Sequence, residues 1–333
     1  MASSQPGSVP ISSGRVGWEL STLAADILSA DTVGRGFDGP NTAARVGGTE
    51  PMRAFRIAYD GTGYYGFQRQ PDVSTVEDTI FDALRSLEVL APDADKPAGY
   101  AAAGRTDAGV SALAQTITLE GPDWLTPRAL NAELPAAVRA WAVADVPDSF
   151  HATHDATRRT YTYHLYAPPA AGDSSATPAK IEQSVDDDRF HAACEALSGP
   201  HDFHNLTPDD HNTERSPTLS AARDGDYLVL TVIAGGFARE LVRRLVSLAQ
   251  DVGTGAVSLA KIERTLSSES LPGHEGIAPA PPEPLVLTAV DYPGLEFTVD
   301  EDAASSARAV FETRRIDRQT GARVAGQVAD GIQ

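Results

Sequence analysis

The hexapeptide Gly104-Arg105-Thr106-Asp107-Ala108-Gly109 lies between two runs that are typical of β-strands. The apolar run Tyr100-Ala101-Ala102-Ala103 precedes it. In the run that follows, apolar residues alternate so that three of them share one face of a strand, namely Leu113, Ile117 and Leu119. The sequence therefore predicts a tight loop, bounded by glycines, that holds a carboxylate between two strands and beside the fixed positive charge of Arg105. Such a loop is suited to mounting a nucleophile.

Further out on both sides, strands and helices follow one another without strict alternation. Before the hexapeptide we expect a strand over residues 55–59 and a helix from Ser74 to about Leu90, with Ser74 and Glu77 as a capping box. The pattern after it predicts a short helix from Pro127 and strands over residues 138–146 and 161–165.

The C-terminal part of the pattern contains a hairpin and a long amphipathic helix. Two strands are expected on either side of Asp224-Gly225, and the longest amphipathic helix is expected over residues 237–252. The remaining expectations are a loop over residues 168–184, helices over 188–197 and 258–266, a strand over 285–292 and a terminal helix near 303–313. Recurrent hairpins favour an α+β fold with antiparallel pairing over a doubly wound parallel sheet.

The composition is that of a globular protein with an unusual charge balance. The 333 residues are 41% hydrophobic and carry a net charge of −19, and the basic residues comprise 24 arginines but only three lysines. An acidic surface that is poor in lysine is typical of proteins from a high-salt cytoplasm. The single cysteine, Cys194, excludes an internal disulfide, and no run is long and apolar enough for a membrane span, so we expect a cytoplasmic enzyme.

The first 51 residues differ from the rest of the chain. They are rich in Ser, Gly and Ala and lack clear periodicity, so we predict a largely disordered extension over residues 1–51. Patterned sequence begins abruptly at Met52, and we hypothesise that the native chain starts there.

Several local motifs allow more than one interpretation. Gly61-Thr62-Gly63-Tyr64-Tyr65-Gly66 matches the dinucleotide-binding pattern, but Pro71 separates it from the expected helix cap at Ser74, so its glycines do not open a helix. The segment after it supplies stacking faces and donors suited to a nucleic-acid backbone, namely Tyr64, Tyr65, Gln68 and Arg69.

Taken singly, the other candidate residues have ordinary explanations. Asp107 alone could be a turn residue, Arg243 a solvated helix charge, and Glu240 with Arg244 a surface pair at i, i+4. The three loop histidines lack the helical spacing of a zinc site, namely His201, His204 and His211. Basic residues nevertheless cluster, which favours a phosphate-rich partner despite the acidic composition, at Arg105, Arg158, Arg159, Arg239, Arg243 and Arg244.

Together, these residues resemble the TruA family of tRNA pseudouridine synthases. The match centres on residues 104–110 and spans about residues 52–295. Other segments that match in the family's order are Tyr64-Tyr65-Gly66-Phe67-Gln68-Arg69-Gln70, Asn131-Ala132-Glu133-Leu134-Pro135, Phe150-His151-Ala152, Ala156-Thr157-Arg158-Arg159, Leu241-Val242-Arg243 and Ala289-Val290-Asp291-Tyr292-Pro293.

The resemblance implies a fold and a set of domains. It implies two ferredoxin-like α/β subdomains whose mixed, mainly antiparallel sheets meet around a central catalytic cleft. The N-terminal catalytic subdomain is expected over residues 52–150, the second over 151–300, and a C-terminal helix and tail over 301–333. It further implies an isomerase that acts as a homodimer, needs neither cofactor nor metal, and converts uridines of the tRNA anticodon stem-loop, at tRNA positions 38–40, to pseudouridine.

The resemblance also implies residue roles. Asp107 is expected to be the nucleophile, at C1′ of the ribose or at C6 of the base, and Tyr161 to stack on the flipped base and assist proton removal from C5. Arg243 is expected to pair with Asp107 and keep it ionised, and Arg105 to fill the space that the flipped nucleotide leaves. The other expected RNA contacts are Tyr64, Tyr65, Gln68, Arg69, Arg158, Arg159 and Arg239.

The chain departs from the family pattern in three places. Ser111 replaces the usual His, Phe67 stands where Trp is frequent, and Thr160 separates the two arginines from Tyr161, which makes Tyr163 the alternative stacking residue. Two rival functions are a non-catalytic RNA-binding protein and an oxidoreductase that binds a dinucleotide through Gly61–Gly66.

Overall fold

A computed structural model describes residues 50–168 and 184–332. The extension predicted over residues 1–51 and the loop predicted over 168–184 lie outside these residues, except at their ends. The strands are β1 (Met52–Tyr59), β2 (Ala101–Ala102), β3 (Ser111–Glu120), β4 (Val138–Asp145), β5 (Arg158–Tyr166), β6 (His201–Asp202), β7 (Glu214–Arg215), β8 (Thr218–Asp224), β9 (Tyr227–Ala234), β10 (Leu285–Asp291) and β11 (Thr298–Val299). The helices are α1 (Val76–Ser86), α2 (Pro127–Glu133), α3 (Asp187–Leu197), α4 (Leu241–Gly253), α5 (Leu259–Thr265) and α6 (Glu301–Gly331), with short 3₁₀ helices η1 (Gly61–Gly63), η2 (His204–Leu206) and η3 (Gly273–Glu275).

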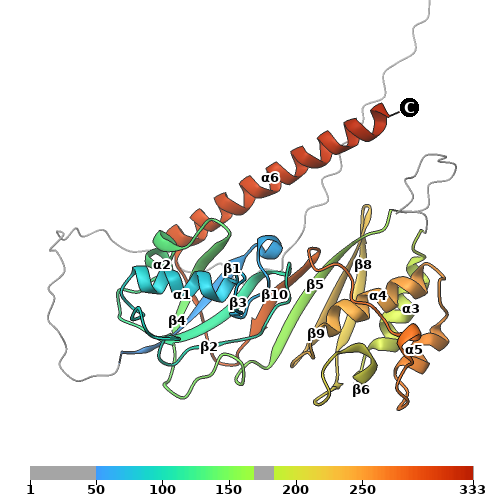
Figure 1. Ribbon diagram of the computed structural model, residues 1–333, viewed down its shortest axis with the longest axis horizontal. Helices are drawn as coiled ribbons and strands as arrows, with labels where there is room; N and C mark the ends of the chain where they lie inside the picture. The colour runs from blue at the N-terminus through green and yellow to red at the C-terminus, as the bar shows by residue number, and fades with distance from the viewer. Residues whose placement is uncertain (1–49, 169–183, 333) are drawn as a thin grey trace, which may run out of the picture. The chain divides into compact units, whose positions relative to one another are not determined.

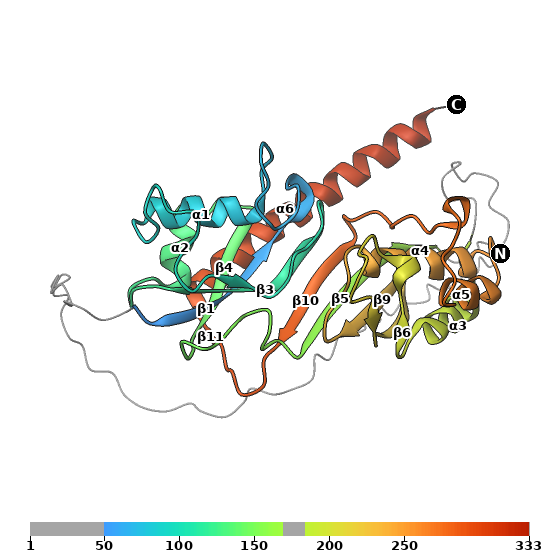
Figure 2. The ribbon, with the colours of Figure 1, turned by 60° about the horizontal axis from the view of Figure 1, so that its bottom comes forward.

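One nine-stranded sheet runs through the described residues (Figures 1 and 2). Its strand order is β11-β4-β1-β3-β10-β5-β9-β8, with β2 paired to β3. Within it, the pairings are antiparallel except between β3 and β10, which run parallel with Val286 opposite Ser111 and Leu287 opposite Ala112. The predicted α+β class with a mainly antiparallel sheet is confirmed, and strands from both halves of the chain form one continuous sheet in which β3 and β10 are the parallel pair.

Helices pack against both halves of the sheet. Figures 1 and 2 show α1 and α2 beside β1, β3 and β4, while α3, α4 and α5 gather beside β5, β8 and β9. The alternation of the strands explains this packing, since every second residue of β4, β5 and β9 is buried. Strand β1 is buried on both faces, because Met52 and Ala54 form a second small apolar cluster with Ala144 and Val146. The predicted subdomain ranges 52–150 and 151–300 stay a prediction.

Local signals set several element boundaries as expected. Thr126 caps α2 by accepting a hydrogen bond from the amide of Ala129, and Pro127 occupies the first turn. Strands β8 and β9 join across Asp224-Gly225 as predicted. None of the helices within 50–168 and 184–332 combines the length and apolar character that a bilayer span needs.

Helix α1 differs from its prediction at both ends. The cap is Thr75 rather than Ser74: its hydroxyl oxygen accepts a hydrogen bond from the amide of Asp78, whose carboxylate accepts the Thr75 hydroxyl proton at 2.6 Å. The helix ends at Ser86 because Glu88 takes a left-handed conformation with φ of 58°.

Three further expectations are wrong. Helix α4 begins at Leu241 and not at residue 237, because Glu240 has a left-handed φ of 61° that a helix cannot contain. Helix α6 extends over 31 residues, far beyond 303–313, and is longer than α4. Leu113 is exposed and does not share a face with Ile117, because the β1–β3 register shifts between the two positions.

Candidate active site

The hexapeptide forms a loop that is fixed on both sides of Asp107. The Thr106 hydroxyl and the Tyr59 hydroxyl lie 2.7 Å apart in the core, and the Thr106 carbonyl accepts the amide of Phe67 at 3.0 Å. After Asp107, its own carbonyl accepts the amide of Val110 at 3.1 Å, and Gly109 takes a left-handed φ of 82° that favours glycine. The backbone therefore presents the Asp107 side chain in one direction.

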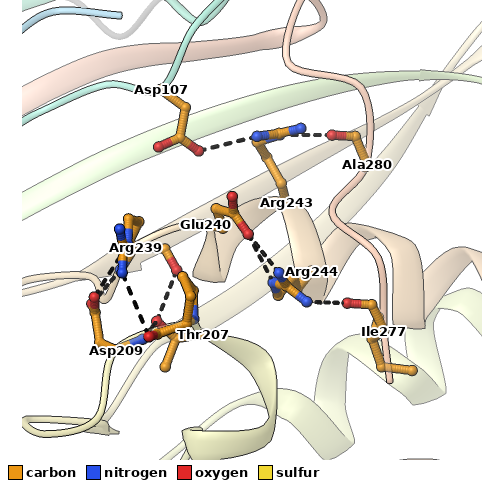
Figure 3. A network of polar contacts seen from close by, with 10 residues as sticks. Asp107, Thr207, Asp209, Arg239, Glu240, Arg243, Arg244, Ile277 and Ala280 are labelled. Carbon is orange, nitrogen blue, oxygen red and sulfur yellow. Dashed lines mark hydrogen bonds and ion pairs between the residues drawn. The ribbon is translucent and has the colours of Figure 1, made fainter. Parts of the chain in front are cut away.

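Arg243 comes from the other half of the chain and meets Asp107 (Figure 3). It lies in the first turn of α4, and its Nη1 is 3.2 Å from Oδ2 of Asp107. Its Nε donates to the carbonyl of Ala280 at 2.6 Å, while the Ala280 amide donates to the Arg243 carbonyl at 3.1 Å. These two contacts orient the guanidinium toward Asp107.

Two further ion pairs lie next to this contact (Figure 3). Arg244 Nη2 is 2.5 Å from Oε2 of Glu240, and Arg239 Nε is 3.3 Å from Oδ1 of Asp209. Glu240 and Arg244 thus form the i, i+4 pair that the sequence suggested.

The environment of Asp107 raises its pKa. Burial has the largest effect and favours the protonated form, whereas the hydrogen bond and the positive charge of Arg243 lower the pKa. Glu240 raises it further by charge repulsion, and Arg239 lowers it. The net direction is upward, so the ion pair offsets part of the effect of burial but not all of it. Asp107 is a carboxylate whose charge depends on Arg243.

Tyr161 lines the same site. It is 8% exposed, and its ring packs edge-on against Phe237 with 5.3 Å between centroids. Burial raises the pKa of Tyr161 to about 12, so its hydroxyl keeps its proton near neutral pH. Tyr161 offers an aromatic face and a hydroxyl donor, but not a phenolate base. The alternative residue, Tyr163, is 2% exposed and does not line the cleft described next.

A cleft of about 1690 Å³ contains Asp107, Tyr161 and Arg243. Its basic side chains outnumber its acidic ones, although the whole chain has a net charge of −19. The basic residues are Arg69, Lys96, Arg105, Arg159, Arg215, Arg239 and Arg243, and the acidic ones are Glu77, Asp95, Asp107, Asp209 and Glu240. Positive charge is therefore gathered where a phosphate backbone would have to approach the carboxylate.

Six of the predicted RNA contacts line this cleft. They are Tyr65, Gln68, Arg69, Arg105, Arg159 and Arg239. Tyr65 is 62% exposed, and Arg105 is exposed next to Asp107. Arg69 is partly engaged, since its Nε lies 2.7 Å from Oδ1 of Asp78. Tyr65 and Arg105 thus lie exposed beside the carboxylate.

Arg159 lines the cleft but is held by the protein itself, and two predicted RNA contacts, Arg158 and Tyr64, lie outside it. The guanidinium of Arg159 is buried and donates to the backbone carbonyls of Ala103, Thr153 and Gly235. These bonds occupy its donors and tie β5 to the strand before Asp107, so the contacts of Arg159 support a structural role. Arg158 pairs with Asp291 outside the cleft, and Tyr64 is half-buried against the core.

The glycine-rich segment does not form a dinucleotide site. Gly61–Gly63 form the 3₁₀ helix η1, and the next α-helix starts only at Val76, so no helix N-terminus faces these glycines. Across the two described parts of the chain, His, Cys, Asp and Glu side chains form no group of three that could hold a metal ion. The site thus consists of a carboxylate, an arginine and an aromatic ring.

Comparisons with known proteins agree with this set of residues. A family model described as tRNA pseudouridine synthase matches residues 193–293. A protein of Natronomonas pharaonis named tRNA pseudouridine synthase A is 59% identical over 278 residues, which cover 84% of this chain and 99% of that protein. This chain belongs to the tRNA pseudouridine synthase family. The family predicted from the motifs is therefore confirmed.

More distant members share the name. The tRNA pseudouridine synthase A of Haloarcula marismortui is 56% identical over 281 residues, covering 84% of this chain and all of that protein. That of Methanosarcina acetivorans is 35% identical over 246 residues, covering 72% of this chain and 84% of the relative. Natronomonas and Haloarcula are halophilic archaea, in agreement with the acidic, lysine-poor composition of this family member.

Some residues of the site were not found from the sequence. Phe237 was assigned to a helix, yet it packs on Tyr161 from the segment before α4. Glu240 was interpreted only as a surface residue, yet its charge acts on Asp107. No local signal marks either role, because both depend on the left-handed turn that precedes α4. For Arg159 a signal did exist, since the alternation of β5 places it on the buried face with Tyr161 and Tyr163.

Proposed function

We propose that this protein isomerises uridine to pseudouridine in tRNA, with Asp107 as the nucleophile. The observation that carries the proposal is the contact of Asp107 with Arg243 inside a cleft that is rich in basic side chains. Family membership supplies the reaction, and the site supplies residue types that fit it. The reaction is redox-neutral, so it requires no electron carrier.

The chemistry assigns a task to each of the three residues. The N1–C1′ bond breaks, the uracil turns, a C5–C1′ bond forms, C5 loses its proton and N1 gains one. Asp107 attacks either C1′ of the ribose or C6 of the base, and both routes need its ionised form. Arg243 stabilises that form. Tyr161 supports the flipped base by stacking and by its protonated hydroxyl.

The substrate region that we propose is the anticodon stem-loop, at tRNA positions 38–40. Exposed Tyr65 and Arg105 at the cleft support this proposal. Tyr65 can stack on an unpaired base of the loop, and Arg105 can fill the space that a flipped nucleotide leaves. Arg239 and Arg69 add positive charge for the phosphates. Mapping pseudouridine in tRNA from a strain that lacks the gene, with and without the plasmid-borne enzyme, tests the positions.

The nucleophile is tested by Asp107→Asn. This change keeps the shape of the side chain but removes the charge, so we expect normal tRNA binding and no pseudouridine. The measurements are filter binding of tRNA and tritium release from tRNA labelled at C5 of uridine. Pseudouridine formation by the variant would contradict the assignment. A non-catalytic RNA-binding protein instead predicts no tritium release from the unchanged enzyme.

The assembly and location that we propose are a homodimer in the cytoplasm. Support for a dimer comes from the end of α6, where Val324, Val328 and Ile332 are exposed and leave an apolar face open to a second copy. A sequence with one cysteine, which is buried, fits a reducing compartment. Light scattering of the purified protein gives the mass, and a monomeric mass in high salt would contradict the dimer.

A further inference from the structure

A buried carboxylate outside the cleft joins α6 to the rest of the protein. Asp60 follows β1, and its side chain is 4% exposed. Its Oδ1 accepts hydrogen bonds from the amide and hydroxyl of Thr62, at 3.2 and 2.8 Å. Its Oδ2 lies 2.6 Å from Nη1 of Arg314 and 2.6 Å from Nη2 of Arg318. Both oxygens are thus used, and both cations come from one face of α6.

The segment that Asp60 begins is in direct contact with the catalytic loop. Asp60 is the N-cap of η1, and the next amide, that of Gly61, donates to Oγ of Ser111 at 3.0 Å. A Cβ at Gly61 would lie 2.0 Å from the carbonyl oxygen of Val110, so only glycine allows this approach. The carbonyl of Tyr64, in turn, accepts the amide of Gly109 at 3.2 Å.

These bonds lead from α6 to the nucleophile in a few steps. Gly109 and Ser111 flank Val110, and the Val110 amide donates to the Asp107 carbonyl at 3.1 Å. Helix η1 and the residue after it are therefore hydrogen-bonded to the chain on both sides of Val110, next to the turn that carries Asp107. Ser111, which departs from the family's usual His, has a role here as the acceptor for η1.

We propose that Asp60, Arg314 and Arg318 form a positioning clamp through which α6 fixes the loop that carries Asp107. The arginines hold Asp60 in place because a buried carboxylate without counter-charges moves toward water. If Asp60 moved, η1 would move with it and release Gly109 and Ser111. A shift of about 1 Å in a reacting group can lower a rate by about a hundredfold.

The proposal predicts an effect on catalysis rather than on RNA binding. It rests on Asp107 being the nucleophile, as proposed above. The critical variant is the double change Arg314→Gln/Arg318→Gln. The matched control is Arg308→Gln/Arg315→Gln, which removes two arginines from the same helix, where they pair with Glu301 and Glu312 at the surface. Both variants have the same net charge.

The experiment measures kcat, KM and the pH profile of kcat/KM by tritium release. We expect the clamp variant to lose at least about tenfold in kcat at unchanged KM. Its acid limb should move to higher pH, because Asp107 separates from Arg243 while Glu240 remains near it. The control should stay within about twofold of the unchanged enzyme, and Arg314→Lys/Arg318→Lys should recover most of kcat.

Several outcomes would overturn the proposal. If the clamp variant folds and keeps its kcat and its acid limb, Asp60 and its partners contribute only to stability. The same conclusion would follow if the control variant lost as much kcat as the clamp variant. If the clamp variant does not fold, Asp60→Asn replaces it, with the same two criteria. If the unchanged enzyme forms no pseudouridine, the proposed function is refuted. This outcome is distinct from a failure of the clamp proposal, in which the unchanged enzyme is active.

Discussion

The contact between Arg243 and Asp107 makes a quantitative prediction for Arg243→Gln. Glutamine keeps a polar amide but is shorter and carries no charge, so the change removes the positive charge together with the direct contact. Arg243 and Asp107 side chains are 13% and 28% exposed, which places the pair at the edge of the protein interior. The charge on Asp107 would then be stabilised by Arg239 alone and opposed by Glu240.

The magnitude follows from the distance. With Nη1 and Oδ2 at 3.2 Å, the two charge centres are roughly 4 Å apart, and at an effective dielectric constant of about 20 they attract by about 4 kcal/mol. Partial exposure of both groups reduces this to about 2 kcal/mol. A tenfold change corresponds to about 1.4 kcal/mol, so kcat/KM should fall by up to about 30-fold, with the full loss in the acid range and a smaller loss at higher pH, where Asp107 is ionised in both enzymes.

The assay is tritium release from uridine-labelled tRNA under single-turnover conditions, in high salt. The matched control is Arg223→Gln in β8, which breaks the ion pair with Asp187 outside the cleft and should cost stability without changing the rate. Arg243→Lys keeps the charge and should lie between the Gln variant and the unchanged enzyme. A Gln variant within threefold of the unchanged rate across the acid range would refute the reasoning.

Three other changes test neighbouring parts of the site. Glu240→Gln removes a charge that raises the pKa of Asp107, so the ionised form persists to lower pH and the acid limb of the kcat/KM profile should move down; an upward shift would contradict this sign. Tyr161→Leu should lower single-turnover rates by about 5- to 150-fold through the loss of about 1–3 kcal/mol of stacking, and Tyr161→Phe by much less. Gly61→Ala places a Cβ 2.0 Å from the Val110 carbonyl oxygen and should cost about 1–3 kcal/mol of stability, visible as a lower Tm; an unchanged Tm would show that the backbone yields.

Much of the element order could be predicted from the sequence because local signals determine it. The hairpin across Asp224-Gly225 and the helix after Thr126 depend on turn and cap residues that act within a few positions. The predicted helix boundary is wrong where two local signals compete. Ser74 and Thr75 both offer a capping hydroxyl, and the helix uses Thr75, which is fully buried. The length of α6 also escaped prediction, since most of it lies outside the core.

The active site divides in the same way. Asp107 could be found from its own loop, because glycines and flanking strands are local features. Its pairing with Arg243 came only from the family resemblance, since the partners are 136 positions apart and many arginines were available. Asp60 gave no signal at all, because its arginines lie on a helix that was predicted to end at residue 313. Long-range charge pairing depends on the complete fold.

The position of β10 has a consequence for how the chain folds during synthesis. Strand β10 lies between β3 and β5 in the sheet but follows both by more than a hundred residues in the chain. A ribosome releases β3 and β5 long before the strand that must separate them, so their exposed edges need protection from pairing with each other or with another nascent chain. The insertion of β10 between β3 and β5 forms contacts between residues far apart in the sequence, so this step is expected to be slow. The insertion of β10 is therefore expected to be the step that fixes in one sheet the strands of the two halves of the chain that carry Asp107 and Arg243.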